Sequence, residues 1–355
     1  MSLQDAVGQM LMVGFYGETL EQDPETLAML EEIRPGSVIL FDKKAGQPNI
    51  TSPQQLKTLT ARIQNNSPSP VFIAIDAEGG YVNRLKKEYG FSVVVPSAAQ
   101  LGNGTTQQTK QVAEKLAIEL KEFGINWNLA PVVDVNINPT SPAIGDLDRS
   151  FSSNPTTVAE HATAFITGLK TQSVVPALKH FPGHGSATED THLGMTDITQ
   201  TYQRDKELAP YEYLISNGYN DPIMTAHIVN NNLDPTSTPA TLSAPIITGM
   251  LRNDLNFQGV VISDDMQMGA IVEKYELEKA AIQAIQAGVD VVMIANNPRT
   301  VKNADGTERT IQNIQDTYRV RGAIITAVEN GTIPRERIYE SVDRILELKK
   351  RYGLE

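Results

Sequence analysis

Residues 174–178 read Val-Val-Pro-Ala-Leu, and they run directly into residues 179–185, which read Lys-His-Phe-Pro-Gly-His-Gly. The first part is short and apolar, which is typical of a strand that is buried on both faces. The second part is polar and contains proline and glycine, which is typical of a loop that carries functional side chains. The same succession, a buried strand followed by polar residues, recurs along the chain and predicts its fold.

Eight short apolar runs of this kind are spaced along the sequence. They span residues 10–15, 37–41, 71–76, 128–133, 174–178, 223–226, 260–263 and 290–294. Helical patterns separate or follow them, over 54–64, 106–123, 155–170, 204–216, 244–255, 276–286 and 335–351. Because strands that alternate with helices pair in parallel through right-handed crossovers, the pattern predicts an α/β fold. Eight strands favour a single-domain (β/α)8 TIM-type barrel, and a doubly wound open sheet is the alternative.

The composition excludes several classes of function. Among 355 residues, 30 are Lys or Arg and 42 are Asp or Glu, which gives a formal net charge of −12. A nucleic-acid partner is therefore not expected, because tracking a phosphate backbone requires a basic face. The sequence contains no cysteine, which excludes disulfides, thiolate metal sites and a cysteine nucleophile. We expect no membrane span, since no apolar run approaches about 18 residues.

We expect one barrel domain over residues 1–355 and a monomer. The polar stretch 297–321 is interpreted as a surface excursion rather than as a domain boundary. The first residues lack the basic and apolar segments of a signal peptide, which favours a cytoplasmic location. Residues 1–3 and Glu355 are interpreted as possible tag remnants, so removal of a natural leader is the open alternative.

Titratable side chains follow five of the predicted strands, the third to the seventh. They are Asp76 and Glu78, then Asp134, then Lys179, His180 and His184, then His227, and finally Asp264 and Asp265. The carboxyl ends of barrel strands meet at one rim, where barrel enzymes carry their chemistry. The sequence therefore predicts an active site at this rim.

Asp190 and His192 lie in a segment without helical periodicity, in which both side chains can point to one side. A carboxylate placed in this way can orient an imidazole and tune its charge. Asp264 ends a dry strand and is a candidate nucleophile or metal ligand, with a helix N-cap as the structural alternative. A metal-dependent barrel hydrolase is the competing class. Pro182 and Gly183 weaken it, because they prevent His180 and His184 from forming a metal pair on a helix.

Other polar or aromatic residues are interpreted mainly as structural. His161 lies in the middle of a predicted helix, Trp127 precedes a strand, and Asp265 points away from the barrel mouth. His184 is expected to hold its loop. For Asp134 and His227, a role in the site and a supporting role stay equally open.

Taken together, these segments resemble family 3 glycoside hydrolases, in their β-N-acetylglucosaminidase branch. The resemblance is carried by residues 179–185 followed by Asp190-x-His192. Further similar blocks lie in the same order at residues 76–85, 130–135, 148–151, 224–227 and 263–266. The similarity covers nearly the whole chain, from about residue 7 to residue 351.

The resemblance implies a retaining β-N-acetylhexosaminidase that removes terminal N-acetylglucosamine (GlcNAc), from cell-wall muropeptides in peptidoglycan recycling. It implies that Asp264 is the nucleophile, that His192 is the general acid and base, and that Asp190 is the partner of His192. It implies that the terminal sugar is bound by Asp76, Arg84, Arg149, Lys179 and His180. It implies neither a metal nor an organic cofactor. Retaining hydrolysis normally uses two carboxylates, so a histidine acid is an exception, although imidazole suits proton transfer near neutral pH.

Three alternatives remain within the resemblance. They are a β-glucosidase, a phosphorolytic variant, and a sugar-binding protein that has lost catalysis. β-Glucosidases of the family take their acid from a second domain, which we do not expect here. Tyr81 stands where the family usually has Arg, Ser186-Ala187 replaces the frequent Asp-Thr, and Glu189 is also unusual, so the aglycone stays open. The cations Arg84, Arg149 and Lys179 are predicted to favour a polar, carboxylate-bearing sugar.

Overall fold

The computed structural model describes residues 1–22, 24–42, 48–296, 299–302, 308–311 and 314–354. Its main sheet has eight strands in the order β6-β3-β2-β1-β12-β11-β9-β7, and all their pairings are parallel. Parallel bridges between Trp127 and Val175 and between Val132 and Lys179 join the two ends of this order. The sheet thus closes into the predicted barrel, and the open-sheet alternative is wrong.

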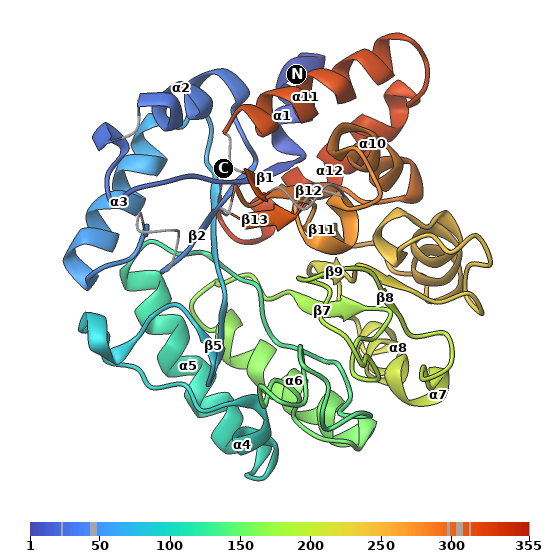
Figure 1. Cartoon of the computed structure of the whole chain (residues 1–355). Coiled ribbons are helices and arrows are strands. Elements are labelled where there is room, and N and C mark those ends of the chain that lie inside the picture. The colour runs from blue at the N-terminus through green and yellow to red at the C-terminus, as the bar shows by residue number, and fades with distance from the viewer. Residues whose placement is uncertain (23, 43–47, 297–298, 303–307, 312–313, 355) are drawn as a thin grey trace.

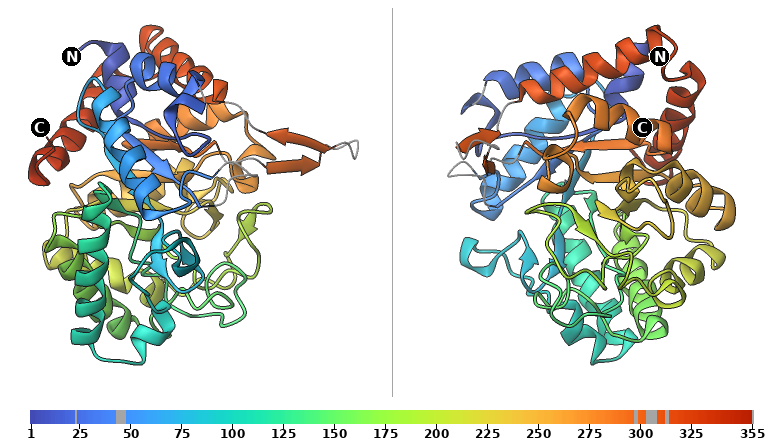
Figure 2. Two further views of the ribbon diagram at one scale, coloured as in Figure 1. Left: turned by 90° about the vertical axis from the view of Figure 1, so that its left-hand side faces the viewer. Right: turned by 45° about the vertical axis from the view of Figure 1, so that its right-hand side comes forward.

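The strands of the barrel are β1 (Leu11–Gly14), β2 (Ser37–Leu40), β3 (Phe72–Ile75), β6 (Trp127–Asn128), β7 (Leu178–Phe181), β9 (Ile223–Thr225), β11 (Val261–Asp265) and β12 (Val291–Ile294). The remaining strands form three small two-stranded sheets: β4 (Ala77–Gly79) with β5 (Val82–Asn83), β8 (Thr196–Asp197) with β10 (Ile228–Val229), and β13 (Arg299–Lys302) with β14 (Glu308–Ile311). Figure 2 shows that the β13–β14 hairpin projects from the body of the barrel.

Helices surround the barrel (Figure 1). The longer ones are α1 (Leu3–Gln9), α2 (Pro24–Ile33), α3 (Pro53–Asn66), α5 (Thr106–Glu122), α6 (Pro155–Lys170), α8 (Ala209–Ser216), the π-helix η4 (Pro245–Asp254), α10 (Leu277–Ala287), α11 (Gln315–Glu329) and α12 (Arg335–Arg351). The short ones are η1 (Leu20–Gln22), η2 (Lys87–Tyr89), α4 (Ala98–Gly102), α7 (Arg204–Glu207), η3 (Ala240–Leu242) and α9 (Gly269–Val272). Within the described ranges, no helix is both long and apolar enough to cross a bilayer.

The predicted helix ends follow from local chemistry. Ser52 caps α3 by accepting a hydrogen bond from the backbone N–H of Gln55, and Asn154 caps α6 in the same way. A proline follows each cap in the first turn, where its missing N–H costs nothing. Gly288 ends α10 with a φ of 120°, which a side chain would oppose.

Two strands differ in their bounds from the prediction, and a proline accounts for each difference. Pro176 has no N–H to donate, and the fifth strand is 178–181 rather than 174–178, so that Lys179 and His180 belong to the strand itself. The fourth strand covers only Trp127–Asn128, because Pro131 interrupts the ladder that was predicted to reach residue 133.

Two further predictions need correction. The helix predicted over 204–216 is divided at Leu208, two residues before Pro210. The surface excursion predicted over 297–321 is wrong in its last part, where α11 begins at Gln315 and buries Thr317 and Val320. Parts of that stretch, and Glu355, lie outside the described residues.

The core contains the residues that were interpreted as structural. Trp127 is buried and packs edge-on against Phe72, with 5.0 Å between ring centroids. His161 is buried, and its Nδ1 lies 2.8 Å from Thr109 Oγ1. At the amino end of β12, the buried carboxylate of Asp290 pairs with three guanidinium groups, those of Arg252, Arg337 and Arg344.

Candidate active site

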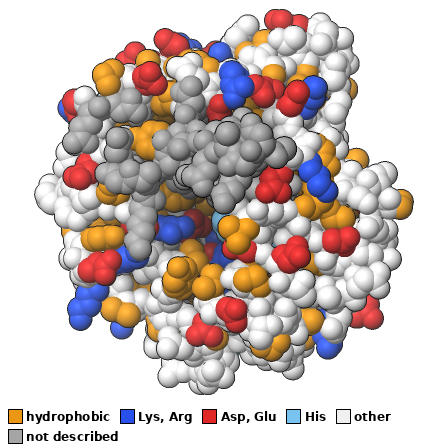
Figure 3. All heavy atoms as spheres, in the orientation of Figure 1, with side chains coloured by type: hydrophobic (Ala, Val, Ile, Leu, Met, Phe, Trp, Pro, Cys, Tyr) orange, Lys and Arg blue, Asp and Glu red, His pale blue; other side chains and the backbone are white. Residues whose placement is uncertain are grey.

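A pocket with a volume of about 440 Å³ opens at the carboxyl ends of the strands. Figure 3 shows this face of the molecule, which is hollowed near its centre, where charged and histidine side chains are visible. All eight residues predicted for the site line this pocket: Asp76, Arg84, Arg149, Lys179, His180, Asp190, His192 and Asp264. The closing of the barrel thus brings together side chains that are far apart in the sequence.

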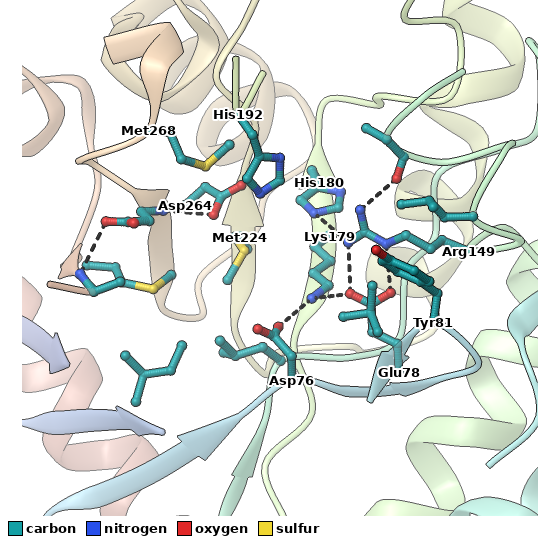
Figure 4. A pocket seen from close by; sticks show the side chains of 18 of the residues that line it. Asp76, Glu78, Tyr81, Arg149, Lys179, His180, His192, Met224, Asp264 and Met268 are labelled. Atoms are coloured by element: carbon teal, nitrogen blue, oxygen red, sulfur yellow. Dashed lines mark hydrogen bonds and ion pairs between the residues drawn. The ribbon is translucent and has the colours of Figure 1, made fainter. Parts of the chain in front are cut away.

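Lys179 and Glu78 are the centre of an ion-pair network on one side of the pocket (Figure 4). The Lys179 Nζ lies 2.9 Å from Asp76 Oδ1 and 2.6 Å from Glu78 Oε1. Arg149 donates two hydrogen bonds of 2.8 Å to Glu78, from Nε and Nη2. A bidentate pair of this kind fixes the plane of the guanidinium group.

Arg84 extends the network from Asp76 to Asp42. Its Nη2 lies 3.2 Å from Asp76 Oδ2, and its Nη1 lies 3.6 Å from Asp42 Oδ1. The three cations among the described lining residues are thus all paired with carboxylates. This corrects the electrostatic argument from the sequence, because paired cations do not create a positive site for a carboxylate-bearing sugar.

These pairings keep the buried groups charged. Burial raises the pKa of Asp76 and Glu78, but the neighbouring cations outweigh it and hold both pKa values below their usual range. Burial likewise lowers the pKa of Lys179, but Asp76 and Glu78 outweigh this and raise it. The site therefore offers a sugar both fixed donors and fixed acceptors.

His180 is oriented by Asp134. The ring donates from Nδ1 to Asp134 Oδ2 over 2.6 Å, and the backbone N–H groups of His180 and His184 also donate to this carboxylate. The His180 Nε2 lies on the other side of the ring, 3.4 Å from Arg149 Nη2. Asp134 is fully buried and contacts His180 and His184, which favours the supporting role of the two that were open.

Asp190 and His192 form a pair inside one loop, which we call the dyad loop (residues 189–195). Asp190 Oδ1 accepts hydrogen bonds from the His192 Nδ1, over 2.7 Å, and from the His192 backbone N–H, over 2.9 Å. The hydrogen bond from the ring is the main cause that lowers the pKa of Asp190 to about 2. The His192 side chain is 51% exposed, and it lines the pocket.

Asp264 lies at the end of β11, and Figure 4 shows the His192 ring beside its carboxylate. Asp264 Oδ1 accepts a hydrogen bond of 2.7 Å from the backbone N–H of Asp265. Burial raises the pKa of Asp264, but His227, His180 and His192 together outweigh it, so that the pKa is lowered. An ionised carboxylate beside an imidazole is a chemically suitable nucleophile and acid pair.

Asp265 and His227 make further hydrogen bonds next to Asp264. Asp265 Oδ1 accepts hydrogen bonds from the backbone N–H groups of Gln267 and Ala295, each over 3.1 Å. His227 Nε2 lies 3.0 Å from the backbone oxygen of Asp265. These contacts favour the structural interpretation of Asp265, which also lines the pocket, and a supporting role for His227. Both interpretations stay predictions.

Sequence reasoning left several lining residues out of the site. Glu78 was noted at the strand end but was not assigned, although it lies two residues after Asp76 and so shares its side of an extended chain. Three methionines, Met224, Met268 and Met293, line the wall and had no signal in the sequence. Tyr81 lines the pocket across from Asp264 and is 74% exposed.

Comparison with known proteins identifies related chains. The model of the glycosyl hydrolase family 3 N-terminal domain matches residues 2–348. A protein named β-hexosaminidase A from Pseudoalteromonas piscicida is 34% identical over 92% of this chain, which spans 55% of that protein. A β-hexosaminidase from Photobacterium profundum is 33% identical, with 85% of this chain and 87% of the relative covered.

Solved structures give the same result. A family 3 β-N-acetylglucosaminidase from Paenibacillus sp. str. FPU-7 superimposes with a TM-score of 0.88 at 33% identity, over 100% of this chain and 63% of its own. A β-N-acetylhexosaminidase from Beutenbergia cavernae superimposes with a TM-score of 0.85 at 28% identity, over 99% of both chains.

Proposed function

The chain belongs to glycoside hydrolase family 3, and we propose that it is a retaining β-N-acetylhexosaminidase that releases terminal β-linked GlcNAc. One observation carries the proposal: the Asp264 carboxylate and the Asp190–His192 pair meet in one pocket, beside a network of paired charges. This arrangement supplies a nucleophile, a proton donor and a sugar-binding surface within one cavity. The names of the relatives support the same activity.

The charge network supports recognition of sugar hydroxyls. A hydroxyl group both donates and accepts, and the network presents carboxylates beside ammonium and guanidinium groups in fixed positions. We assign binding of the terminal sugar to Asp76, Arg84, Arg149, Lys179 and His180, with Glu78 as an additional member. Because each of these cations already has a carboxylate partner, a neutral sugar can bind without leaving a charge in the pocket unpaired.

The apolar part of the lining favours an N-acetyl sugar over glucose. Met224 and Met268 flank Asp264 in Figure 4, and Met293 lines the same pocket. Thioether side chains adapt to small apolar groups, such as the methyl of an acetamide. A 2-hydroxyl group at the same place would lose a water partner without gaining a polar one.

In the first step, an Asp264 oxygen attacks the anomeric carbon while His192 Nε2 gives a proton to the departing glycosidic oxygen. The bond to the aglycone breaks and a bond to Asp264 forms, which produces a covalent glycosyl-enzyme. In the second step, His192 removes a proton from a water molecule, which displaces the sugar from Asp264. Asp190 stabilises the charged ring during both transfers.

Substitution of the nucleophile tests the proposal. The Asp264→Ala variant should lose release of the leaving group from an aryl β-N-acetylglucosaminide, because the neighbouring carboxylate at the end of β11, Asp265, is already held by the backbone N–H groups of Gln267 and Ala295. Undiminished turnover by this variant would overturn the assignment. A panel of aryl glycosides, with and without phosphate, separates this activity from β-glucosidase and phosphorolytic activities.

Other expectations stay predictions. Muropeptides as substrates, a cytoplasmic location, a monomeric state and a single domain are each untested. Within the described residues, no group of three or more His, Cys, Asp or Glu is arranged to hold a metal ion. Treatment with a chelator tests the metal-dependent alternative directly, since activity that is lost to the chelator and restored by zinc favours that class.

A further inference from the structure

The dyad loop rests against two parts of the barrel rim, and we propose that this seat positions His192 relative to the nucleophile. On one side the seat consists of Gly269 and Ala270, which follow Asp264 in the chain. On the other side it consists of His184, which contacts Thr191. The inference rests on the proposed function, and it assigns Thr191, His184 and Gly269 as positioning residues of the acid/base.

The contact with Gly269 and Ala270 is made by backbone atoms. The Ala270 backbone N–H donates to the backbone carbonyl oxygen of Thr191 over 3.2 Å. A Cβ placed on Gly269 would lie only 2.9 Å from the His192 oxygen and 3.0 Å from the Leu193 carbonyl carbon. Because backbone atoms cannot rotate away, the dyad loop can occupy this position only if residue 269 has no side chain.

The contact with His184 is made by Thr191, the one residue of the dyad loop that is buried. Thr191 is 3% exposed, although Asp190 is half-buried and His192 is exposed. Its Oγ1 lies 3.3 Å from His184 Nε2. The backbone N–H of His184 in turn donates to Asp134, the carboxylate that orients His180. One series of contacts therefore leads from the sugar-binding histidine to the acid/base.

The internal contacts of the loop cannot replace the seat. Asp190 accepts hydrogen bonds from the His192 ring and backbone, and from the backbone N–H groups of Leu193 and Gly194 through its own carbonyl. These contacts orient the ring relative to the loop. They do not fix the loop relative to Asp264, which the seat does. Burial lowers the pKa of His184 to about 4, so this ring is neutral and does not repel a protonated His192.

The Gly269→Ala variant tests the seat against a matched control. Residue 269 begins the helix α9, and alanine is a better helix former than glycine, so the fold itself gains from the change. The control is Gly322→Ala in α11, where an added Cβ meets nothing within 4 Å. Neither variant should lower the thermal midpoint of the wild type, and Gly322→Ala should raise it slightly.

The expected signature depends on the leaving group. For a chitobiose substrate, whose leaving group needs a proton, kcat/KM of Gly269→Ala should fall about 10²-fold, the cost of misplacing a catalytic group by about 1 Å. For a 2,4-dinitrophenyl N-acetylglucosaminide, which needs no proton, kcat/KM should fall less than about 5-fold. On this substrate kcat and KM should fall together, because the glycosyl-enzyme accumulates when His192 acts poorly as a base. Gly322→Ala should match the wild type on both substrates.

Two conservative variants of Thr191 test the role of its hydroxyl group. Thr191→Val keeps the shape and removes the hydroxyl. Its kcat/KM should fall about 10-fold for chitobiose and much less for the dinitrophenyl substrate. Thr191→Ser keeps the hydroxyl and should restore most of the activity. A structural defect alone would lower kcat/KM equally for both substrates.

The outcomes separate the inference from the proposed function. If the wild type hydrolyses neither substrate, the proposed function fails. If the wild type is active and Gly269→Ala matches Gly322→Ala, or if it loses activity equally on both substrates, only the seat is overturned.

Discussion

The substitution Glu78→Gln tests most directly whether the ion pairs in the pocket matter for stability and activity. Glu78 makes three contacts with cations, two to Arg149 at 2.8 Å and one to Lys179 at 2.6 Å. Glutamine has nearly the same shape, but one of its two terminal groups is an NH₂, which faces a donor whichever way the amide is turned. At least one of the three contacts therefore becomes a contact between two donors.

The magnitude follows from the burial of these groups. Removing one partner of a buried ion pair costs about 3–5 kcal/mol, because the remaining charge stays buried. We expect a loss of about 3 kcal/mol in the free energy of unfolding, the lower end of that range, since Lys179 keeps its 2.9 Å contact with Asp76. We also expect kcat/KM to fall about 10²-fold, because Arg149 and Lys179 then lose their fixed positions.

Denaturant unfolding and steady-state hydrolysis, run side by side, provide the assay. The control is Glu160→Gln, which removes the same charge at an exposed position of α6. The pKa of Glu78 is lowered in the folded protein, so its contribution is fully present above the unfolded value of about 4.3 and is lost as the pH falls through the folded pKa. The difference from the wild type should therefore be largest near neutral pH. Equal stability and equal kcat/KM of the two variants near neutral pH would refute the reasoning.

Three other predictions concern single residues. Asp290→Asn should lower the free energy of unfolding by about 3 kcal/mol or more without changing KM, since Asp290 pairs with three arginines at the opposite end of the barrel from the pocket; unchanged denaturation would contradict this. His192→Ala should slow hydrolysis by about 10²-fold or more for poor leaving groups and least for good ones, and a uniform small effect would remove its role as acid. Burial raises the pKa of Glu207 to about 7, so the folded state holds a proton there that the unfolded state releases; the stability of the wild type relative to Glu207→Gln should fall as the pH rises from about 4.3 to 7, and a constant difference across this range would contradict it.

The sequence predicted the barrel because each strand is a short apolar run that ends in polar residues. It placed the fourth and fifth strands less well, since Pro131 and Pro176 interrupt backbone pairing at points that apolar character alone does not reveal. The start of α11 was missed for a related reason. The residues around Gln315 are polar, and only packing against the barrel buries Thr317 and Val320.

The candidate site was predicted as a set of residues but not as a network. Asp76, Lys179 and Arg149 come from three different parts of the chain, and no local pattern states that they share carboxylate partners. Glu78 was overlooked for that reason, although its side chain joins two of the predicted cations. The three lining methionines also could not be predicted, because methionine in or just after a strand has the same local pattern whether it faces the pocket or the core.

The charge of the pocket shows why pairing has to be seen in three dimensions. A chain with a net charge of −12 that places three cations at its rim suggested an anionic ligand. In the folded protein, Asp42, Asp76 and Glu78 compensate these cations. Binding of a sugar then depends on oriented hydrogen bonds rather than on net charge.

The central claim is that Asp264 forms a covalent bond to the sugar. The most direct measurement is intact-protein and peptide mass spectrometry of His192→Ala after brief reaction with 2,4-dinitrophenyl β-N-acetylglucosaminide. This substrate needs no acid for the first step, and the variant lacks the base for the second, so the intermediate should accumulate. The account predicts a mass increase of one N-acetylglucosaminyl residue on the peptide that contains Asp264. Turnover without any adduct, or an adduct on a different residue, would contradict it.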